Sequence, residues 1–86
     1  MPAAYKLFVL RDAEKELGRI PKKDVERILG RTRGLRTNPR PAGVEKLSTL
    51  ERYRVRQGDW RILFEIDDDR REVTVVKIAH RREVYR

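Results

Sequence analysis

Hydrophobic and polar positions alternate along three stretches of this chain, and a period of two predicts β-strands. The first stretch runs from Tyr5 to Leu10, and its consecutive apolar residues, Leu7 to Val9, predict burial on both faces. The second runs from Tyr53 to Asp67. The third, Glu72 to Ala79, is rich in β-branched residues, which favour strands. The pattern therefore predicts a sheet built largely from the C-terminal half of the chain.

The central stretch predicts a β-hairpin. Its two alternating runs are separated by Gly58-Asp59, and Gly permits the positive φ that a tight hairpin turn requires. If these two residues form the loop, Arg56 lies directly opposite Arg61. Alternation then sorts the side chains by face. The core face would carry Tyr53, Val55, Trp60, Ile62, Phe64 and Ile66, and the other face would carry Arg54, Arg56, Arg61, Leu63 and Glu65.

The faces of the final strand depend on the length of the turn before it. A turn of three or five residues places Lys77 on the arginine face, whereas a turn of four residues inverts the strand. We prefer the first arrangement, because it keeps Lys77 away from the helices. It puts Thr74, Val76 and Ile78 in the core, and Val73, Val75, Lys77 and Ala79 on the arginine face.

Two helices are predicted between the first strand and the hairpin. The first covers Ala13 to Arg19 with Asp12 as its N-cap, and Gly18 and Pro21 end it. Pro21 also suits the first position of the second helix. That helix has an apolar stripe at Val25, Ile28, Leu29, Thr32 and Leu35, and exposed positions at Lys22, Lys23, Glu26, Arg27, Arg31 and Arg33.

The predicted fold is α+β, with the order β-α-α-β-β-β in one domain spanning residues 1–86. A two-helix hairpin packs on a small, mainly antiparallel, four-stranded sheet. The segment from Thr37 to Val44 is a short connector, because it contains two prolines and a glycine and is followed at once by strand-like sequence.

Charge narrows the possible partners. The 22 basic residues outnumber the 14 acidic ones, and the net charge of +8 favours nucleic acid, an acidic protein or an anionic membrane. Most of the basic residues are Arg, which suits bidentate recognition of phosphate or carboxylate. With no Cys and one His, the sequence predicts neither a metal site nor a cofactor. A run of only four apolar residues near the N-terminus predicts a cytoplasmic protein that does not enter the membrane.

The pairing of Arg56 with Arg61 is unusual. Like charges directly opposite one another on adjacent strands destabilise a sheet, so this pair indicates an anion that neighbouring residues do not supply. The alternative is a solvated, arginine-rich surface that protects the sheet from aggregation.

The segments YRVRQGDWRILFEID (residues 53–67) and HRREVYR (residues 80–86), together with the order of the elements, resemble the RelE-type toxins of bacterial toxin–antitoxin pairs. The resemblance implies a RelE-like fold and a ribosome-dependent endoribonuclease that cleaves messenger RNA in the A site. It also implies a cognate antitoxin, expected to be acidic, that neutralises the toxin in a hetero-oligomer, while the free toxin is monomeric. Messenger RNA and ribosomal RNA would be the other partners.

The resemblance also implies site residues. Arg54 and Arg56 fall where well-known members place two catalytic lysines, and Arg61 falls on the arginine after the hairpin turn. Arg81 and Tyr85 match the C-terminal arginine and tyrosine of the family. Arginine in place of lysine keeps the charge but removes a group whose pKa can be lowered into the range of a proton donor. Longer members also carry a C-terminal helix beyond the position where this sequence stops.

Metal-free RNA cleavage uses the 2′-hydroxyl against the adjacent phosphate, so it needs a base, charge stabilisation and a proton donor. Arg61 and Arg81 would stabilise the phosphorane. Tyr85 would be the base if positive neighbours favour its phenolate, although it could instead only attach the tail to the sheet. His80 and Glu83 are the candidate donors, and each could equally be structural. The basic surface of the second helix, from Lys22 to Arg36, is expected to contact the RNA backbone. The other residues expected to contact it are Lys46, Arg52, Lys77 and Arg82.

Two other functions remain open from the sequence. ParE-type relatives share the fold and act on DNA gyrase, typically without the arginine and tyrosine set, so the presence of that set argues against this function. A noncatalytic basic module that binds RNA or the ribosome would need the basic face but not Tyr85.

Overall fold

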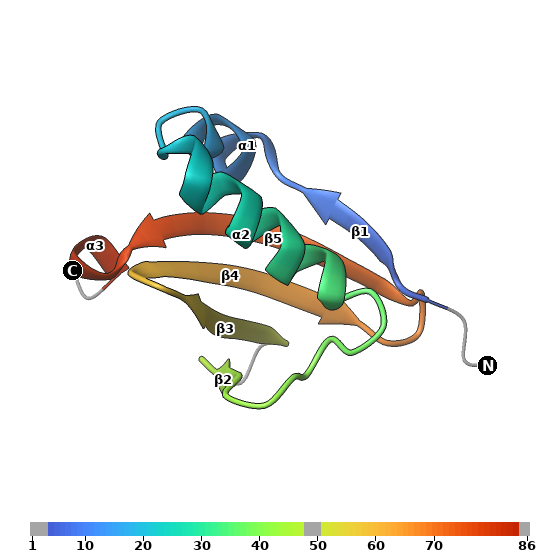
Figure 1. Cartoon of the computed structure of the whole chain (residues 1–86). Helices are drawn as coiled ribbons and strands as arrows, with labels where there is room; N and C mark the ends of the chain where they lie inside the picture. Colours follow the sequence, from blue (N-terminus) through green and yellow to red (C-terminus); the bar gives the residue numbers. More distant parts are fainter. Residues whose placement is uncertain (1–3, 48–50, 85–86) are drawn as a thin grey trace.

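The computed structural model describes residues 4–47 and 51–84, which form one mixed sheet with two helices and a short C-terminal third helix (Figure 1). The strands follow the order β1-β5-β4-β3-β2, in which β1 is parallel to β5 and the other pairs are antiparallel. This confirms the predicted α+β order, with one strand more than expected. The elements are β1 (Lys6–Val9), α1 (Arg11–Leu17), α2 (Lys22–Gly34), β2 (Glu45–Lys46), β3 (Arg52–Gln57), β4 (Trp60–Asp67), β5 (Glu72–His80) and α3 (Arg81–Val84).

The β3–β4 hairpin has the register that its turn predicts. Gly58 adopts a φ of 61°, and Gln57 pairs with Trp60 across the two-residue loop. Arg56 consequently lies opposite Arg61. Because the turn fixes the register and strands alternate, the faces of both strands follow from the sequence alone.

The turn between β4 and β5 differs from the sequence prediction. Asp67 pairs with Glu72, so residues 68–71 form a turn of four residues, the length that inverts the strand. The first half of β5 therefore corrects four assignments: Val73 and Val75 are buried in the core, whereas Thr74 and Val76 are not on the core face.

A β-bulge at Val76 restores the expected faces in the second half of β5. The residues on either side of Val76 pair with Phe64 and Leu63, which are adjacent on β4, so Val76 has no partner across the ladder. Beyond it, Ile78 is buried in the core and Lys77 is exposed on the opposite face, as the sequence predicts. The bulge thus reconciles a four-residue turn with a buried Ile78.

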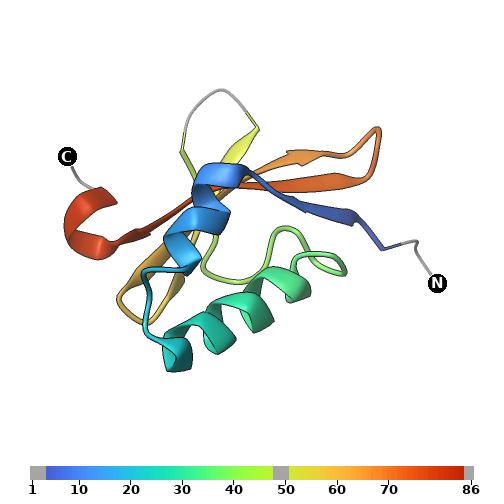
Figure 2. The same cartoon turned by 90° about the horizontal axis from the view of Figure 1, so that it is seen from above.

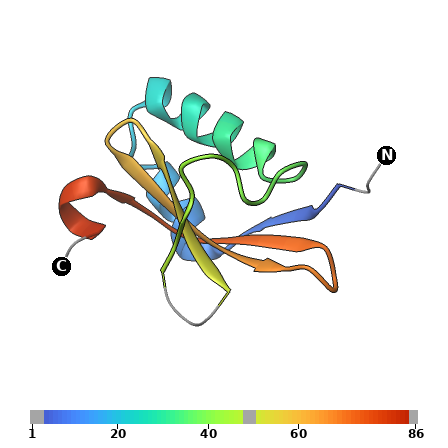
Figure 3. The ribbon, with the colours of Figure 1, turned by 90° about the horizontal axis from the view of Figure 1, so that it is seen from below.

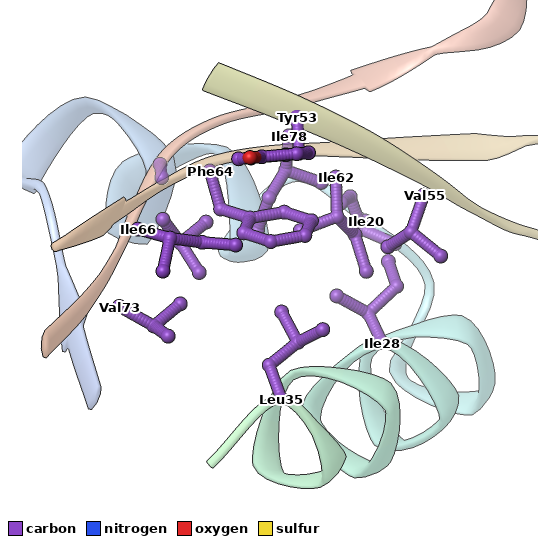
Figure 4. Close-up of a cluster of buried hydrophobic side chains, with 12 residues drawn as sticks. Ile20, Ile28, Leu35, Tyr53, Val55, Ile62, Phe64, Ile66, Val73 and Ile78 are labelled. Atoms are coloured by element: carbon purple, nitrogen blue, oxygen red, sulfur yellow. The ribbon is translucent and has the colours of Figure 1, made fainter. Parts of the chain in front are cut away.

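The core lies between α2 and one face of the sheet. In Figure 4, Ile28 and Leu35 point from α2 toward Phe64 and its neighbours on the strands. Trp60 lies on this face but is only partly buried, with its indole nitrogen 3.3 Å from a carboxylate oxygen of Asp24 on α2, so its predicted core position is half correct. The buried cluster comprises Ala13, Ile20, Ile28, Leu35, Tyr53, Val55, Ile62, Phe64, Ile66, Val73, Val75 and Ile78.

The N-terminal segment departs from the prediction in two ways. Phe8 is 46% exposed and Leu10 48% exposed, so β1 is not buried on both faces. As an edge strand, it is covered by the core on one face only. The helix α1 begins at Arg11, and neither Asp12 nor any other side chain caps it. None of the helices in the described part of the chain has both the length and the apolar character needed to cross a membrane.

Candidate functional site

The face of β3, β4 and β5 turned away from α2, which we call the open face, carries the predicted cluster of basic residues. Figure 3 shows α2 on the other side of these strands. The central pair of the cluster is Arg56 on β3 and Arg61 on β4. Lys77 enters the same face from β5, opposite Leu63. Alternation on three paired strands thus gathers onto one surface cations that are as far apart in the sequence as Arg54 and Lys77.

Arg61 is the buried member of the cluster, with only 6% of its surface exposed. Its Nη1 donates to the carbonyl oxygens of Gly58 at 3.2 Å and of Trp60 at 3.1 Å. Its Nε is buried and has no hydrogen-bond partner among the described residues. The small Ala79 lies opposite it on β5 and Arg56 lies opposite it on β3. Within the described ranges, therefore, no carboxylate forms an ion pair with this buried cation.

Arg54 has a partner that the sequence pattern did not predict. The short strand β2 pairs with β3 and brings Glu45 opposite Arg54, where the two side chains form an ion pair at 2.9 Å. This carboxylate neutralises the outer part of the cluster and does not reach its centre. A two-residue strand gives too short a pattern to detect, so the sequence offered no signal for this ion pair.

The C-terminal end of β5 brings Arg81 to the hairpin turn. The backbone N–H of Arg81 donates to the carbonyl oxygen of Asp59 at 2.8 Å, and its Nε lies 3.8 Å from the Asp59 carboxylate. Figure 1 shows α3 beside this end of the hairpin. Arg82 follows, exposed, and its N–H donates to Nδ1 of His80. Arg81 is therefore held at the same end of the sheet as Arg61.

The proposed proton donors are placed differently. His80 pairs with Trp60 and contacts its ring edge-on at 5.3 Å, so it lies on the face of α2 rather than on the open face. Glu83 lies in α3, and its side chain is outside the described part of the structure. Tyr85 lies outside the described residues. His80 and the pair formed by Arg56 and Arg61 thus lie on opposite faces of the sheet.

Two of the predicted RNA contacts lie outside the cluster. Lys46 pairs with Glu51 at 3.3 Å and approaches the ring of Tyr53 on the other face. Arg52 pairs with Glu65 at 2.8 Å near the far end of the open face. Both charges are already neutralised within the chain, whereas Lys77 and Arg82 take part in no ion pair with another described residue.

The far end of the sheet is acidic. A groove of about 590 Å³ lies there. Carboxylates dominate its walls, and a phosphate would be repelled from it. We therefore do not place an anion site in this groove, despite its size. The carboxylates that line it are Glu51, Glu65, Asp67, Asp68, Asp69 and Glu72.

The shifted pKa values also lie at this acidic end. Asp68 accepts hydrogen bonds from Arg40 at 2.9 Å and from Tyr5 at 2.7 Å, which hold the pKa of its carboxyl below the usual range. The same bond raises the pKa of Tyr5. Glu51 accepts from Tyr53 at 2.7 Å and from Lys46, and its pKa is lowered. We call these five side chains the Arg40 clamp: Tyr5, Arg40, Glu51, Tyr53 and Asp68.

The donor set of the cluster suits an anion and does not suit a cation. Guanidinium groups donate in fixed, planar pairs that fit phosphoryl and carboxylate oxygens. Residues 4–47 and 51–84 contain no group of three or more His, Asp or Glu side chains placed to hold a metal ion. The centre of the open face is thus a positive site whose buried donors are partly unsatisfied.

Comparison with known proteins identifies relatives at the level of family and fold. Residues 7–85 match the family described as the ParE toxin of the type II toxin–antitoxin system parDE. No curated protein matches the sequence.

Among solved structures, the chain is similar to the RelBE2 toxin–antitoxin complex of Mycobacterium tuberculosis, with 20% identity and a TM-score of 0.80 over 90% of this chain and 98% of that one. It is also similar to the archaeal RelE–RelB complex of Pyrococcus horikoshii, with 21% identity and a TM-score of 0.81 over 93% and 98%. The isolated Escherichia coli RelE toxin gives 21% identity and a TM-score of 0.80 over 95% and 92%. At these identities the likeness establishes a shared fold.

Proposed function

Because this chain belongs to the ParE toxin family of type II toxin–antitoxin systems and has a RelE-like fold, we propose that it is a ribosome-dependent endoribonuclease that cleaves messenger RNA in the ribosomal A site. Its role as a toxin follows from the family. The proposal adds a substrate, the messenger, and a cytoplasmic site of action on ribosomes. It also adds a partner, an acidic antitoxin that neutralises the free, monomeric toxin in a hetero-oligomeric complex.

The observation that carries the proposal is the environment of Arg61. This guanidinium is buried, lies opposite Arg56 and keeps an unpartnered Nε among the described residues. Burying an unpaired charge is costly, so a fold that retains one is expected to bind an anion there. A phosphodiester carries one negative charge, and the phosphorane formed from it carries two. A positive site should therefore bind the transition state more tightly than the ground state.

Cleavage would proceed by attack of the 2′-hydroxyl oxygen on the adjacent phosphorus. The new O–P bond forms a phosphorane, and the bond to the 5′-oxygen then breaks, leaving a 2′,3′-cyclic phosphate and a 5′-hydroxyl. Arg61 and Arg81 would donate to the equatorial oxygens, while Arg54, Arg56 and Lys77 raise the local positive potential. No metal is required, since the arginines supply the charge.

Two protons must move in this reaction. We assign removal of the 2′-hydroxyl proton to Tyr85, whose phenolate would be favoured by positively charged neighbours. The leaving 5′-oxygen must gain a proton from His80 or Glu83. The orientation of His80 toward Trp60 weakens its assignment, because it lies on the other side of the strand from Arg61. Lys77 and Arg82 would hold the RNA backbone, whereas Lys46 and Arg52 are neutralised by acidic neighbours.

A second candidate function is inhibition of DNA gyrase on the same fold, and the ParE name of the matching family favours it. The cluster of Arg54, Arg56, Arg61 and Arg81 argues for the nuclease, because gyrase-directed relatives typically lack it together with the tyrosine. A noncatalytic module that binds RNA would account for the positive face without explaining the burial of Arg61.

The test is single-turnover messenger cleavage on programmed ribosomes at saturating protein. Arg61→Lys keeps the charge but loses the planar pair of donors. It should raise the activation free energy of the chemical step by about 2–4 kcal/mol. Tyr85→Phe should slow it roughly a hundredfold or more. Replacing Arg70, which lies exposed in the β4–β5 turn, by Lys is the matched control and should have no effect.

The outcomes separate the candidate functions. Equal rates for the parent and Tyr85→Phe would mean that Tyr85 only packs. A well-folded parent that cuts no messenger but blocks gyrase supercoiling would replace the nuclease by the gyrase inhibitor. Tight RNA binding without cleavage or gyrase inhibition would leave the noncatalytic module.

A further inference from the structure

The side chain of His80 joins the end of β5 to the start of α3. His80 is the last residue of β5, so its backbone is extended, and α3 begins at the next residue, Arg81. Nδ1 of His80 accepts a hydrogen bond from the backbone N–H of Arg82 at 3.3 Å. An extended residue that directly precedes a helix, and whose side chain accepts from the second helical N–H, is an N-cap. His80 therefore satisfies a donor that a helix leaves without an internal partner.

The imidazole of His80 is itself held by contacts that lead back to α2. Its ring lies edge-on to the ring of Trp60, with 5.3 Å between the centroids, and the two residues are paired across β4 and β5. The indole N–H of Trp60 in turn donates to a carboxylate oxygen of Asp24 at 3.3 Å. In Figure 2, the start of α2 (teal), the β3–β4 turn and α3 (red) lie at the same end of the sheet. Contacts from α2 through β4 thus orient the ring that caps α3.

The short helix α3 carries residues that the proposed reaction uses. Its first residue, Arg81, donates its backbone N–H to the carbonyl oxygen of Asp59 at 2.8 Å. The next N–H, that of Arg82, donates to His80. Two successive peptide groups are therefore fixed, one by the hairpin turn and one by the imidazole. These two bonds set the direction in which the side chain of Arg81 leaves the sheet, and the chain continues from α3 to Tyr85.

One imidazole cannot both cap this helix and act as a general acid. A neutral imidazole has one donor and one acceptor nitrogen, so an accepting Nδ1 places the proton on Nε2. In an imidazolium both nitrogens donate, and Nδ1 can no longer accept from Arg82. A positive charge is also unfavourable at the N-terminus of a helix, where the helix dipole is positive. The imidazolium is the form that protonates a leaving group, so the geometry of His80 selects the other form.

We propose that His80 is a positioning residue: its Nδ1 caps α3, holds Arg81 and Arg82 in place for cleavage, and transfers no proton. The effect on cleavage rests on the proposed function, whereas the cap is a property of the folded chain. The proposal accounts for the placement of the only histidine of the sequence on the α2 face, away from Arg61. It leaves Glu83 as the candidate proton donor.

Two substitutions separate the acceptor from the ring. His80→Phe keeps an aromatic ring against Trp60 but has no acceptor, whereas His80→Asn loses the ring and keeps an oxygen of the kind that caps helices best. The first measurement is amide hydrogen exchange at Arg82. The amide of Ile66, which donates to the carbonyl oxygen of Glu51 at the acidic end of the sheet, is the internal reference. Exchange at Arg82 should be about fivefold faster in His80→Phe and should return to within about twofold of the parent in His80→Asn.

The second measurement is single-turnover messenger cleavage on programmed ribosomes at saturating protein. A positioning role predicts a severalfold slower rate in His80→Phe, and His80→Asn should recover most of that loss because it restores the acceptor. A proton donor predicts instead an equal loss, of roughly a hundredfold, in both variants, because neither has an imidazole. That result would overturn the proposal. Faster exchange at Arg82 without slower cleavage in His80→Phe would overturn the positioning role as well.

The exchange measurement does not depend on the nuclease. A parent that cuts no messenger would refute the proposed function, and fast exchange at Arg82 in His80→Phe alone would still support the cap. Equal exchange at Arg82 in the parent and His80→Phe, with Ile66 protected in both, would overturn the cap. If His80→Phe fails to fold and Ile66 loses its protection, His80→Asn decides. Slow exchange at Arg82 in that variant supports the cap, and fast exchange in a folded variant refutes it.

Discussion

Among single residues, Arg61 lies in an environment that is unfavourable for a charged side chain. Its charge is buried, its strand neighbour is another arginine and one of its donors is unsatisfied among the described residues. Each of these features costs stability, and none contributes to packing. A residue of this kind is retained for what it binds, and the stability it costs must be supplied by the rest of the core.

This cost can be measured by removing the charge. Arg61→Met keeps an extended side chain and relieves both the desolvation and the repulsion with Arg56, so it should stabilise the fold by about 1–2 kcal/mol while abolishing RNA cleavage. Thermal and urea unfolding followed by circular dichroism would detect the gain. Arg70→Met, at an exposed turn position, is the control and should change stability by no more than about 0.5 kcal/mol. A destabilised Arg61→Met variant would show instead that the two carbonyl contacts of Arg61 outweigh its burial.

Among the elements, β5 determines which side chains reach the open face. Its four-residue turn buries Val73 and Val75, and the bulge at Val76 then returns Lys77 to the basic cluster. A strand without the bulge would place Ile78 in solvent and Lys77 against α2. The bulge is therefore the feature that permits a packed core and a basic site on one strand.

Deleting Val76 tests this directly. Without this unpaired residue, the pairs Val75–Phe64, Lys77–Leu63 and Ile78–Ile62 follow one another as a regular ladder, so Ile78 stays in the core and Lys77 stays on the open face. We therefore expect the deletion variant to keep a cooperative unfolding transition in urea, followed by circular dichroism. Val76→Ala keeps the bulge and should also remain folded. A deletion variant without a cooperative transition would contradict the assignment of Val76 as the extra residue of the bulge.

The Arg40 clamp joins elements that are far apart in the sequence. Arg40 lies in the connection between α2 and β2, Tyr5 precedes β1, and Asp68 lies in the β4–β5 turn. The hydrogen bonds to Asp68 and Glu51 lower the pKa of both carboxyls from ordinary values of 3.8 and 4.5. A lowered carboxyl pKa stabilises the folded state above the ordinary value, and this stability is lost as pH falls through the folded pKa.

The clamp should therefore give the protein an acid-sensitive stability. Tm should be constant near neutrality and fall as pH drops below about 4.5. Tyr5 has the opposite sign, because its pKa is raised: its contribution is present below the ordinary value of 10.0 and is lost at higher pH. Asp68→Asn should flatten the acid limb of Tm against pH. Asp69→Asn removes a carboxylate from the same turn without breaking the clamp, and an equal flattening there would contradict the assignment.

For the whole molecule, the charge distribution decides how it meets other molecules. The net charge is +8, yet one end of the sheet carries the acidic groove and the other carries the arginine cluster. Polyanions will therefore approach from the arginine end, and the acidic end will be turned away from them.

We expect an acidic antitoxin to bind at the same positively charged end of the sheet. We expect high yields of the toxin only when it is coexpressed with a small acidic protein, and we expect the complex to protect Arg56 and the hairpin turn from hydrogen exchange. The measurement compares amide exchange in the free and bound toxin, with the acidic β4–β5 turn as the internal reference. A toxin that is harmless when overexpressed alone, and that binds no acidic neighbour, would contradict this expectation.

Features that depend on neighbours along the chain could be predicted from the sequence. The turn at Gly58-Asp59 set the register of β3 and β4, and alternation then placed Arg54, Arg56 and Arg61 on one face, because both rules act within a few residues. The order of helices and strands, and the apolar stripe of α2 at Ile28 and Leu35, follow from local periodicity in the same way.

Features that depend on partners distant in sequence emerge only in the folded chain. Pairing with β3 created the strand β2 and brought Glu45 to Arg54, and an edge position left Phe8 exposed. The bulge in β5 is a compromise between a four-residue turn and a core that requires Ile78, and no pattern within β5 reveals it. The burial of Arg61 likewise requires two neighbouring strands at once. Local sequence fixes the direction in which a side chain points, whereas burial and neutralisation depend on the segments that the whole fold brings alongside it.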